Sequence, residues 1–136
     1  MRPDLKQEII KTLHTHFPDI ITRGEKTEQN SNVEMFFVKE LSMDYLPELG
    51  EFERVLYQFV IEYYPEDKSE RQRKQLREME FKLIQIFKLW EDMSLRAYSI
   101  NSEFEADRLN FFIDFNVRYQ ILISQDEKFS DLEVSI

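Results

Sequence analysis

Residues Arg108 to Ser124 read RLNFFIDFNVRYQILIS, and this stretch decides the fold. Its odd positions are apolar over most of the run, whereas most of its even positions are polar. Alternation with a period of two, carried mainly by β-branched and aromatic residues, predicts an antiparallel strand with one face on a core. We expect the rest of the chain to cover that face.

The natural partner of this strand is Glu51 to Tyr64 (EFERVLYQFVIEYY), which alternates in the same way. Both runs are long and carry an aromatic stripe, so we expect them to pair antiparallel. Val33 to Leu41 (VEMFFVKEL) is apolar on both sides in its middle, which predicts a central strand. Shorter strands are expected at Ile20 to Thr22 and at Leu95 to Asn101.

Two amphipathic helices are expected to cover the sheet. The first follows Pro3 and has an apolar stripe of Leu5, Ile9, Leu13 and Phe17. The second opens with a capping-box pattern at Ser69 and Gln72, and its stripe is Leu76, Met79, Leu83, Phe87 and Trp90. The predicted fold class is α+β: a single antiparallel or mixed β-sheet of about four to five strands under two helices, in the order α-β-β-β-α-β-β.

A chain of 136 residues is long enough for one core, and no internal repeat or linker divides it. We assign residues 1–123 to a single α+β domain and residues 124–136 to an acidic C-terminal tail. The run Arg23 to Asn32 is polar, without an apolar anchor, and predicts a surface loop.

The composition excludes several kinds of chemistry. The chain has no Cys, its two glycines stand apart, and His14 and His16 are spaced to point to different sides of a helix. We therefore assign no catalytic, cofactor-binding or metal-ligating residue, and predict a protein that is not an enzyme. No run is long and apolar enough for a bilayer, and a net charge of -9 argues against nucleic-acid affinity.

Carboxylates are abundant enough to keep an enzymatic alternative open. Pairs such as Glu103 with Glu105, or Asp114 with Glu62, could serve general acid–base or metal-assisted chemistry. Nothing in their spacing selects one pair. A solvated or inter-subunit role on the polar strand face explains Asp114 equally well.

Charge is distributed unevenly along the chain. Between positions 68 and 77 five bases stand against one acid, and between positions 40 and 53 five acids stand without a base. Either both sets are solvated surface, or they meet between neighbouring copies in a head-to-tail contact. On the second interpretation the candidate interface residues are Arg71, Arg73, Lys74, Arg77, Asp44, Glu48, Glu51 and Glu53.

The segment Ser42 to Gly50 (SMDYLPELG) is predicted to be a connector, because Pro47 and Gly50 interrupt regular structure. It is unusually apolar for a loop. Its apolar side chains either fold back on the domain or form an edge that contacts a partner, with Leu46 and Leu49 as the candidate contacts.

Four short pieces of the chain resemble the phage tail terminator, or tail completion, family of tailed phages and of prophages in Gram-positive bacteria. They are FPDI (17–20), MFFVKEL (35–41), ELGEFERVLYQFVIEYYP (48–65) and LNFFIDFNVRY (109–119). The likeness covers roughly Leu5 to Ile123. The sequence departs from the family pattern in the polar run Arg23 to Asn32, where relatives tend to have a short apolar or Gly-containing segment.

The resemblance implies a structural role without cofactors. Several copies, typically a hexamer, would form a ring that caps the tail tube, stops its polymerisation and joins the head connector. The implied partners are the chain itself, the tail tube protein and the head-closure protein; DNA would pass through without specific binding, and no membrane is involved. The implied location is the virion tail, after assembly in the host cytoplasm.

Three alternatives stay open at this point. A head–tail joining protein from another layer of the connector would have a similar fold. A small carboxylate-dependent enzyme and a monomeric regulatory module belong to different functional classes.

Overall fold

The computed structural model describes residues 3–24, 33–66 and 71–120. Within these ranges the fold is α+β, and the predicted order α-β-β-β-α-β-β is confirmed, with two very short strands added after the second helix. The elements are α1 Leu5–His16, β1 Ile21–Arg23, β2 Met35–Pro47, β3 Phe52–Tyr64, α2 Gln72–Phe87, β4 Leu89–Trp90, the 3-10 helix η1 Glu91–Met93, β5 Leu95–Arg96, β6 Ser99–Phe104 and β7 Leu109–Gln120.

The main sheet is mixed and has the strand order β1-β2-β3-β7-β6. Among the described strands of this sheet, β1 alone runs parallel to its neighbour, and the other pairs are antiparallel. The expected pairing of the two long strands is confirmed, since β3 and β7 are in register from Phe52 opposite Gln120 to Tyr63 opposite Leu109. A second, two-stranded sheet joins β4 and β5.

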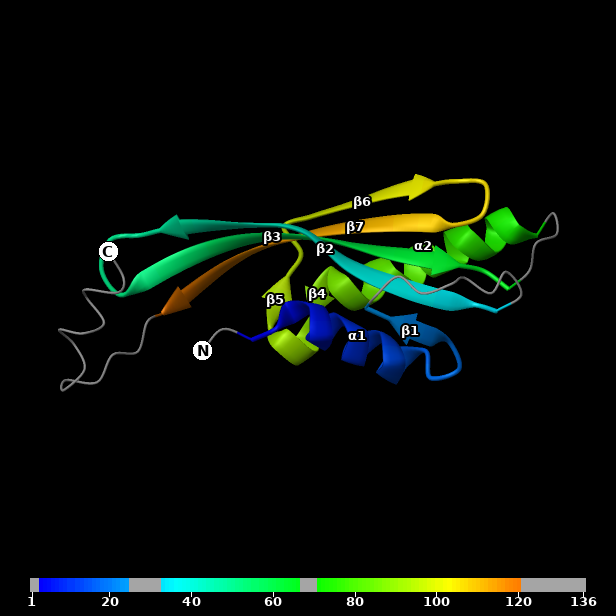
Figure 1. The fold of residues 1–136 in the computed structure, drawn as a ribbon, viewed down its shortest axis with the longest axis horizontal. Helices are drawn as coiled ribbons and strands as arrows, with labels where there is room; N and C mark the ends of the chain where they lie inside the picture. The colour runs from blue at the N-terminus through cyan, green and yellow to red at the C-terminus, as the bar shows by residue number, and fades with distance from the viewer. Residues whose placement is uncertain (1–2, 25–32, 67–70, 121–136) are drawn as a thin grey trace.

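The core lies between one face of the main sheet and the two helices (Figure 1). The alternation of β7 is confirmed, because its odd residues from Leu109 to Val117 are all buried. They form one cluster with the apolar stripes of both helices, which are Leu5, Ile9 and Leu13 in α1 and Leu76, Met79, Leu83 and Phe87 in α2. Burying each such side chain contributes on the order of 1.5–3 kcal/mol before entropy is subtracted.

The predicted connector Ser42 to Gly50 is wrong over most of its length, because β2 continues through it to Pro47. The register of β2 against β3 shifts between Glu40 and Ser42, which marks a β-bulge. The extra residue inverts the alternation, so odd residues such as Met43 lie after the bulge on the face that even residues occupy before it. The alternation of apolar and polar residues is interrupted at such a position, although the strand continues.

Two further boundaries differ from the sequence prediction. The predicted strand Leu95 to Asn101 is divided, since β5 pairs with β4 whereas β6 pairs with β7. Trp90 does not close the stripe of α2 but lies beyond the helix, opposite Leu95. The helix ends at Phe87, where the C-cap N–H is bonded to the carbonyl of Ile84, and the chain then turns into the small sheet.

Some predicted features fall outside the described residues. They are Ser69 of the capping box, most of the polar loop 23–32, residues 121–124 of the predicted long strand and the acidic tail 124–136. The N-cap position of α2 is occupied by Arg71, whose side chain makes no capping hydrogen bond.

Trp90 connects the first helix to the core. It is buried, its ring packs against Phe87 and Phe115, and its indole Nε1–H donates to Oγ1 of Thr12 at 2.9 Å. The Thr12 hydroxyl in turn donates to the carbonyl of Glu8 at 2.9 Å. A buried indole N–H needs such an acceptor, so this contact holds α1 against the small sheet.

Thr12→Val should lower the free energy of unfolding by about 1–3 kcal/mol, because the buried Trp90 N–H loses its acceptor while the shape of the side chain is kept. Thr15→Val is the matched control: Thr15 is exposed and makes the same bond, to the carbonyl of Lys11 at 2.9 Å. Urea unfolding of both variants measures the difference. Equal effects would contradict the assigned role of Thr12.

The strands β2, β3 and β7 extend past the two helices at one end of the molecule (Figure 1). We call this extension the arm and define it as residues 42–58 of the β2–β3 hairpin and residues 114–120 of β7. Its inner part still contributes Val55, Tyr57, Phe115 and Val117 to the core. Its tip is the turn at residues 48–51, where Gly50 has a φ of +85°, a conformation that glycine adopts without strain. The arm therefore carries the hairpin turn away from the helix-covered core.

Candidate functional site

The basic candidate residues lie together on the first half of α2. Arg71 is the N-cap residue, and Arg73, Lys74 and Arg77 follow on exposed positions of the helix. This end of α2 lies at the opposite end of the long axis from the tip of the arm (Figure 1). The basic residues therefore form one exposed surface, remote from the arm.

The acidic candidate residues lie on the arm. Asp44 is in β2, Glu48 and Glu51 are in the turn, and Glu53 is near the start of β3. The sequence prediction missed the bases beside them. Glu48 forms ion pairs with Arg54 at 3.2 Å and with Arg118 at 3.5 Å, in accord with the pairing of β3 with β7.

These two bases change the charge of the acidic set. Counting Arg54 and Arg118 with the five acids of positions 40–53 reduces its net charge from -5 to -3. The Glu48 carboxylate thus forms ion pairs within its own chain, whereas Glu51, in the same turn, is exposed. A count of charges along the sequence could not include Arg118, since the pairing of β3 with β7 is what places it beside the turn.

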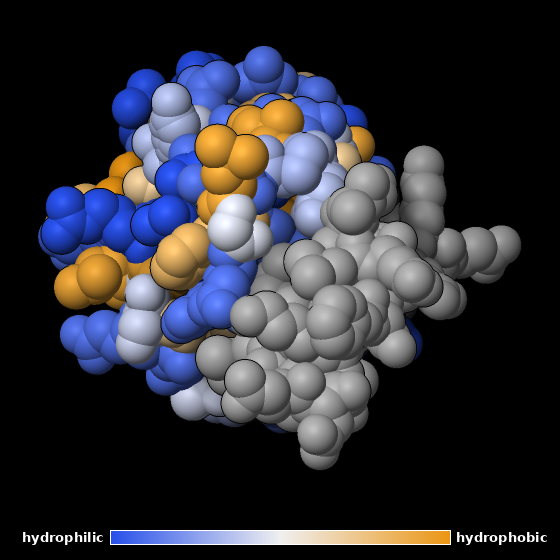
Figure 2. Space-filling model, turned by 90° about the vertical axis from the view of Figure 1, so that its left-hand side faces the viewer, coloured by the Kyte–Doolittle hydropathy of each residue, from blue (hydrophilic) through white to orange (hydrophobic). Residues whose placement is uncertain are grey.

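The apolar side chains of the former connector do not fold back on the domain. Leu46 lies in β2 and is 44% exposed, and Leu49 in the turn is 99% exposed. Leu41, Met43 and Tyr45 along the same strand are also exposed. Figure 2, which views this end of the molecule, shows hydrophobic side chains at the surface among hydrophilic ones. The interpretation that they fold back on the domain is therefore wrong, and contact with a partner stays a prediction.

A shallow groove lies on the outer side of α2, over the basic residues. It is lined by Arg73, Lys74, Arg77, Glu78, Phe81 and Lys82. Phe81 is 63% exposed, and the sequence analysis did not single it out. The signal was present, because Phe81 is apolar but falls out of phase with the buried stripe of α2. An exposed aromatic among cations is a common feature of protein-binding surfaces.

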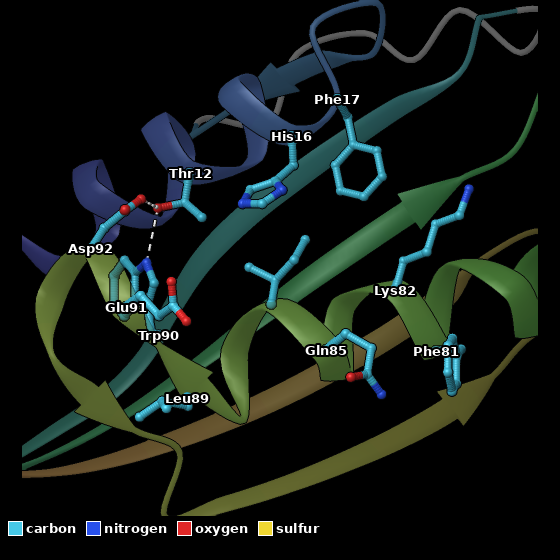
Figure 3. A pocket seen from close by; sticks show the side chains of 11 residues that line it. Thr12, His16, Phe17, Phe81, Lys82, Gln85, Leu89, Trp90, Glu91 and Asp92 are labelled. Carbon is cyan, nitrogen blue, oxygen red and sulfur yellow. Dashed lines mark hydrogen bonds between the residues drawn. The ribbon is translucent and has the colours of Figure 1, made fainter.

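A second hollow separates α1 from the C-terminal half of α2 (Figure 3). Its volume is about 620 Å³, and His16, Phe17, Gln85, Leu89 and Trp90 are among its lining residues. At one end the Thr12 hydroxyl accepts from the Trp90 indole N–H and donates to Oδ2 of Asp92 at 3.5 Å, as the dashed lines in Figure 3 show. These polar groups are directed at each other and not at a common point in the hollow.

The carboxylate pairs proposed from the sequence are not brought together. Asp114 lies opposite Gln58 and Glu62 lies opposite Asn110, so four residue steps, or about 13 Å at ~3.3 Å per step, separate the two acids along the sheet. Glu62 accepts from Lys39 at 3.1 Å, and Asp114 accepts from Ser99 at 2.8 Å. Each carboxylate has a local partner, which favours a structural role.

In the second pair, Glu103 and Glu105, one carboxylate again has local partners. Glu105 forms an ion pair with Arg108 at 2.7 Å and accepts from the Asn110 amide at 3.0 Å. Glu103 is exposed at the outer strand β6. Among the described residues, no group of three or more His, Asp or Glu side chains is placed to hold a metal ion.

A polar network fixes the start of α2 on the sheet. The buried Tyr63 hydroxyl donates to the Glu34 carboxylate and accepts from Nε2 of Gln75, which is 3.1 Å away. Burial, and then the hydrogen bond to Glu34, raise the pKa of the Tyr63 phenol well above its usual range. The phenol therefore stays protonated and continues to donate. Through Gln75 it sets where the basic face of α2 lies.

Tyr63→Phe should lower the free energy of unfolding at neutral pH by about 1–3 kcal/mol, because Glu34 and Gln75 lose a buried partner. Because the pKa of the phenol is raised in the folded state, its contribution to the free energy of unfolding is complete below the ordinary tyrosine pKa of about 10. The contribution decreases as the pH rises above that value, because the unfolded chain then loses the phenol proton. The stability difference between wild type and variant should thus narrow above that pH. Denaturant unfolding across an alkaline pH series measures it; a difference that widens would contradict the assignment.

None of the helices in the described ranges is long and apolar enough to cross a bilayer. A family model described as "Phage tail terminator protein" matches residues 4–128. A search of curated proteins finds no match.

Proposed function

Because this chain belongs to the phage tail terminator family, we propose that its copies assemble into a ring, a hexamer, that caps the end of a completed tail tube. The cap blocks the surface to which further tube subunits would add. Its other side forms the joint to the head connector. The observation that carries this proposal is the family match, which extends over nearly the whole described chain.

The shape of the molecule supports a ring. Acidic and apolar side chains lie at the tip of the arm, and the basic groove lies on α2. The tip of the arm and the first half of α2 are at opposite ends of the long axis (Figure 1). Surfaces that complement each other but lie apart on one chain favour heterologous, head-to-tail contacts. Such contacts close into a ring when the rotation between copies allows it.

The charge of the chain suits a channel for DNA. The net charge is -9, so the phosphate backbone is repelled rather than retained. DNA would therefore pass the ring without specific binding. The partners of the ring are then other proteins: the tail tube protein on one side and the head-closure protein on the other.

We place the assembled protein in the virion tail, and its assembly in the cytoplasm of the bacterial host. The structural role is consistent with the local pairing of the carboxylates described above. The capping of the tail tube is the part of the proposal that distinguishes this chain from a head–tail joining protein of another connector layer.

Deletion of the gene from the phage or prophage that encodes this chain tests the function. We expect filled heads and separate tails, with tail tubes of uncontrolled length, because no cap stops their growth. Electron microscopy of lysates measures both features, and expression of the wild-type chain in trans should restore joined particles. Unjoined tails of normal length would contradict the capping role and favour a head–tail joining protein; joined particles of normal length would contradict both.

A further inference from the structure

We propose that Leu49, at the tip of the arm of one copy, inserts into the groove beside Phe81 on α2 of the next copy. This contact rests on the proposed ring and identifies the occupant of the groove as a second copy of this chain. It also assigns the exposed tip of the arm to contacts between copies, not to the tube or to the head.

The tip of the arm presents Leu49 on a braced turn. Glu48 is held by ion pairs to Arg54 and Arg118, and the Arg118 guanidinium lies 3.9 Å from the centre of the Phe52 ring. These contacts tie both sides of the turn to β3 and β7. Leu49 is nevertheless 99% exposed, and it extends the exposed apolar residues of β2 to the tip of the arm.

The groove on α2 offers the complementary surface. Phe81 is the exposed apolar residue of this helix face, and the cations Arg73, Lys74 and Lys82 line the same groove. The Arg77 side chain is positioned by a cation–π contact, since its guanidinium lies 5.3 Å from the centre of the Phe104 ring. An aromatic anchor with surrounding arginines is the composition that dominates binding energy at protein interfaces.

The charges on the two surfaces are opposite. At the tip of the arm Glu48, Glu51 and Glu53 stand against Arg54 and Arg118, three acids against two bases, which leaves a net charge of -1. The groove is lined by four cations and one acid, a net charge of +3. Ionic attraction of this kind orients the partners during encounter and fixes the register, while burial of the apolar pair supplies affinity. The acids would approach the cations as Leu49 approaches Phe81.

The contact has to form between copies. In one molecule the tip of the arm lies at one end of the long axis, and the first half of α2 lies toward the other (Figure 1). The two surfaces are different patches of the same chain, so each copy can give its tip to one neighbour and receive a tip from another. That is the arrangement from which a closed ring is built.

Disulfide cross-linking in assembled tails tests the contact, and the absence of native cysteine makes the result clear. The double variant Leu49→Cys, Phe81→Cys should give, on mild oxidation, a ladder of covalent multimers of this chain that ends at the ring size. A disulfide forms only when the two Cα atoms come within about 4.4–6.8 Å. Each single-cysteine variant should give no ladder. Leu49→Cys combined with Tyr98→Cys is the matched control, because Tyr98 is 65% exposed but lies outside the groove.

A second measurement keeps the contact testable if the cysteine variants do not assemble. A photoreactive amino acid at position 49 should give an adduct with residues of α2 in another copy, identified by peptide mass. Adducts with the tube protein or with a head protein would overturn the proposal. Rings that form without the ladder would overturn the Leu49–Phe81 contact alone, whereas tails that contain no multimer of this chain would contradict the ring itself.

Discussion

Reversal of three bases at the start of α2, Arg71→Glu, Arg73→Glu and Lys74→Glu together, is expected to reduce the yield of infectious particles by about 100-fold while the chain still folds. Each ring contact would replace attraction to Glu51 and Glu53 with repulsion. Like charges across an interface cost several kcal/mol, and a loss of about 3 kcal/mol corresponds to roughly 100-fold in an equilibrium constant. Plaque titre and electron microscopy of the lysate measure the loss.

Folding should survive this reversal because all three side chains are exposed and stand at the beginning of the helix. Acidic residues in the first turn interact favourably with the helix dipole, so the new glutamates suit their positions. Circular dichroism and thermal unfolding should therefore match the wild type within about 0.5 kcal/mol.

A control with the same change in net charge separates a specific contact from a general effect of charge. Lys11→Glu, Arg23→Glu and Arg96→Glu together alter three exposed bases that lie outside the groove. This variant should retain nearly the wild-type titre. If both triple variants lose titre equally, the head-to-tail contact through α2 is contradicted.

The second large effect concerns the core. Phe59→Ala is expected to lower the free energy of unfolding by about 3–5 kcal/mol, a large part of the roughly 5–15 kcal/mol that holds a domain together. Phe59 is fully buried in β3 and its ring packs against Tyr57 and Phe115, with centres 5.9 and 6.3 Å away. Its removal would leave a cavity between the sheet and the helices.

Urea unfolding measures this loss, with Phe81→Ala as the matched control. Phe81 is the same residue type, but it is 63% exposed on the outer face of α2. We expect its truncation to change stability by less than about 0.5 kcal/mol while it weakens the proposed contact between copies. Similar losses in the two variants would show that the arrangement of the core is not as described.

The core of the fold could be predicted from the sequence because its signals are periodic. Alternation in residues 109–119 and 52–64 identified the two long strands, and the length and aromatic stripe that both share predicted their pairing. Spacing of three and four identified the helices and the face that each one buries. These patterns depend only on which side of an element each residue occupies.

The elements that were missed lack such a signal. A single extra residue near Leu41 inverts the alternation of β2, so the strand looked as though it ended there. Trp90 has the spacing of the helix stripe, but α2 ends at Phe87, and Trp90 reaches the core from β4. In both cases the path of the backbone, and not the side chains, decides where the element ends, so the apolar pattern does not report the boundary.

The candidate site was predicted only in part. The charged residues were identified from the sequence, but their separation to opposite ends depends on how far the β2–β3 hairpin extends past the helices. The neutralisation of Glu48 by Arg118 depends on the register of β3 with β7. Phe81 could have been recognised as an apolar residue on the polar side of its helix.

The most direct test of the central claim is a cryo-electron microscopy reconstruction of the neck of the virion that encodes this chain. We predict a closed ring of this chain, in one layer between the last ring of tube subunits and the head connector, with the arm of each copy reaching α2 of its neighbour. Finding the chain elsewhere in the particle, or absent from the mature virion, would contradict its role as the cap of the tail tube.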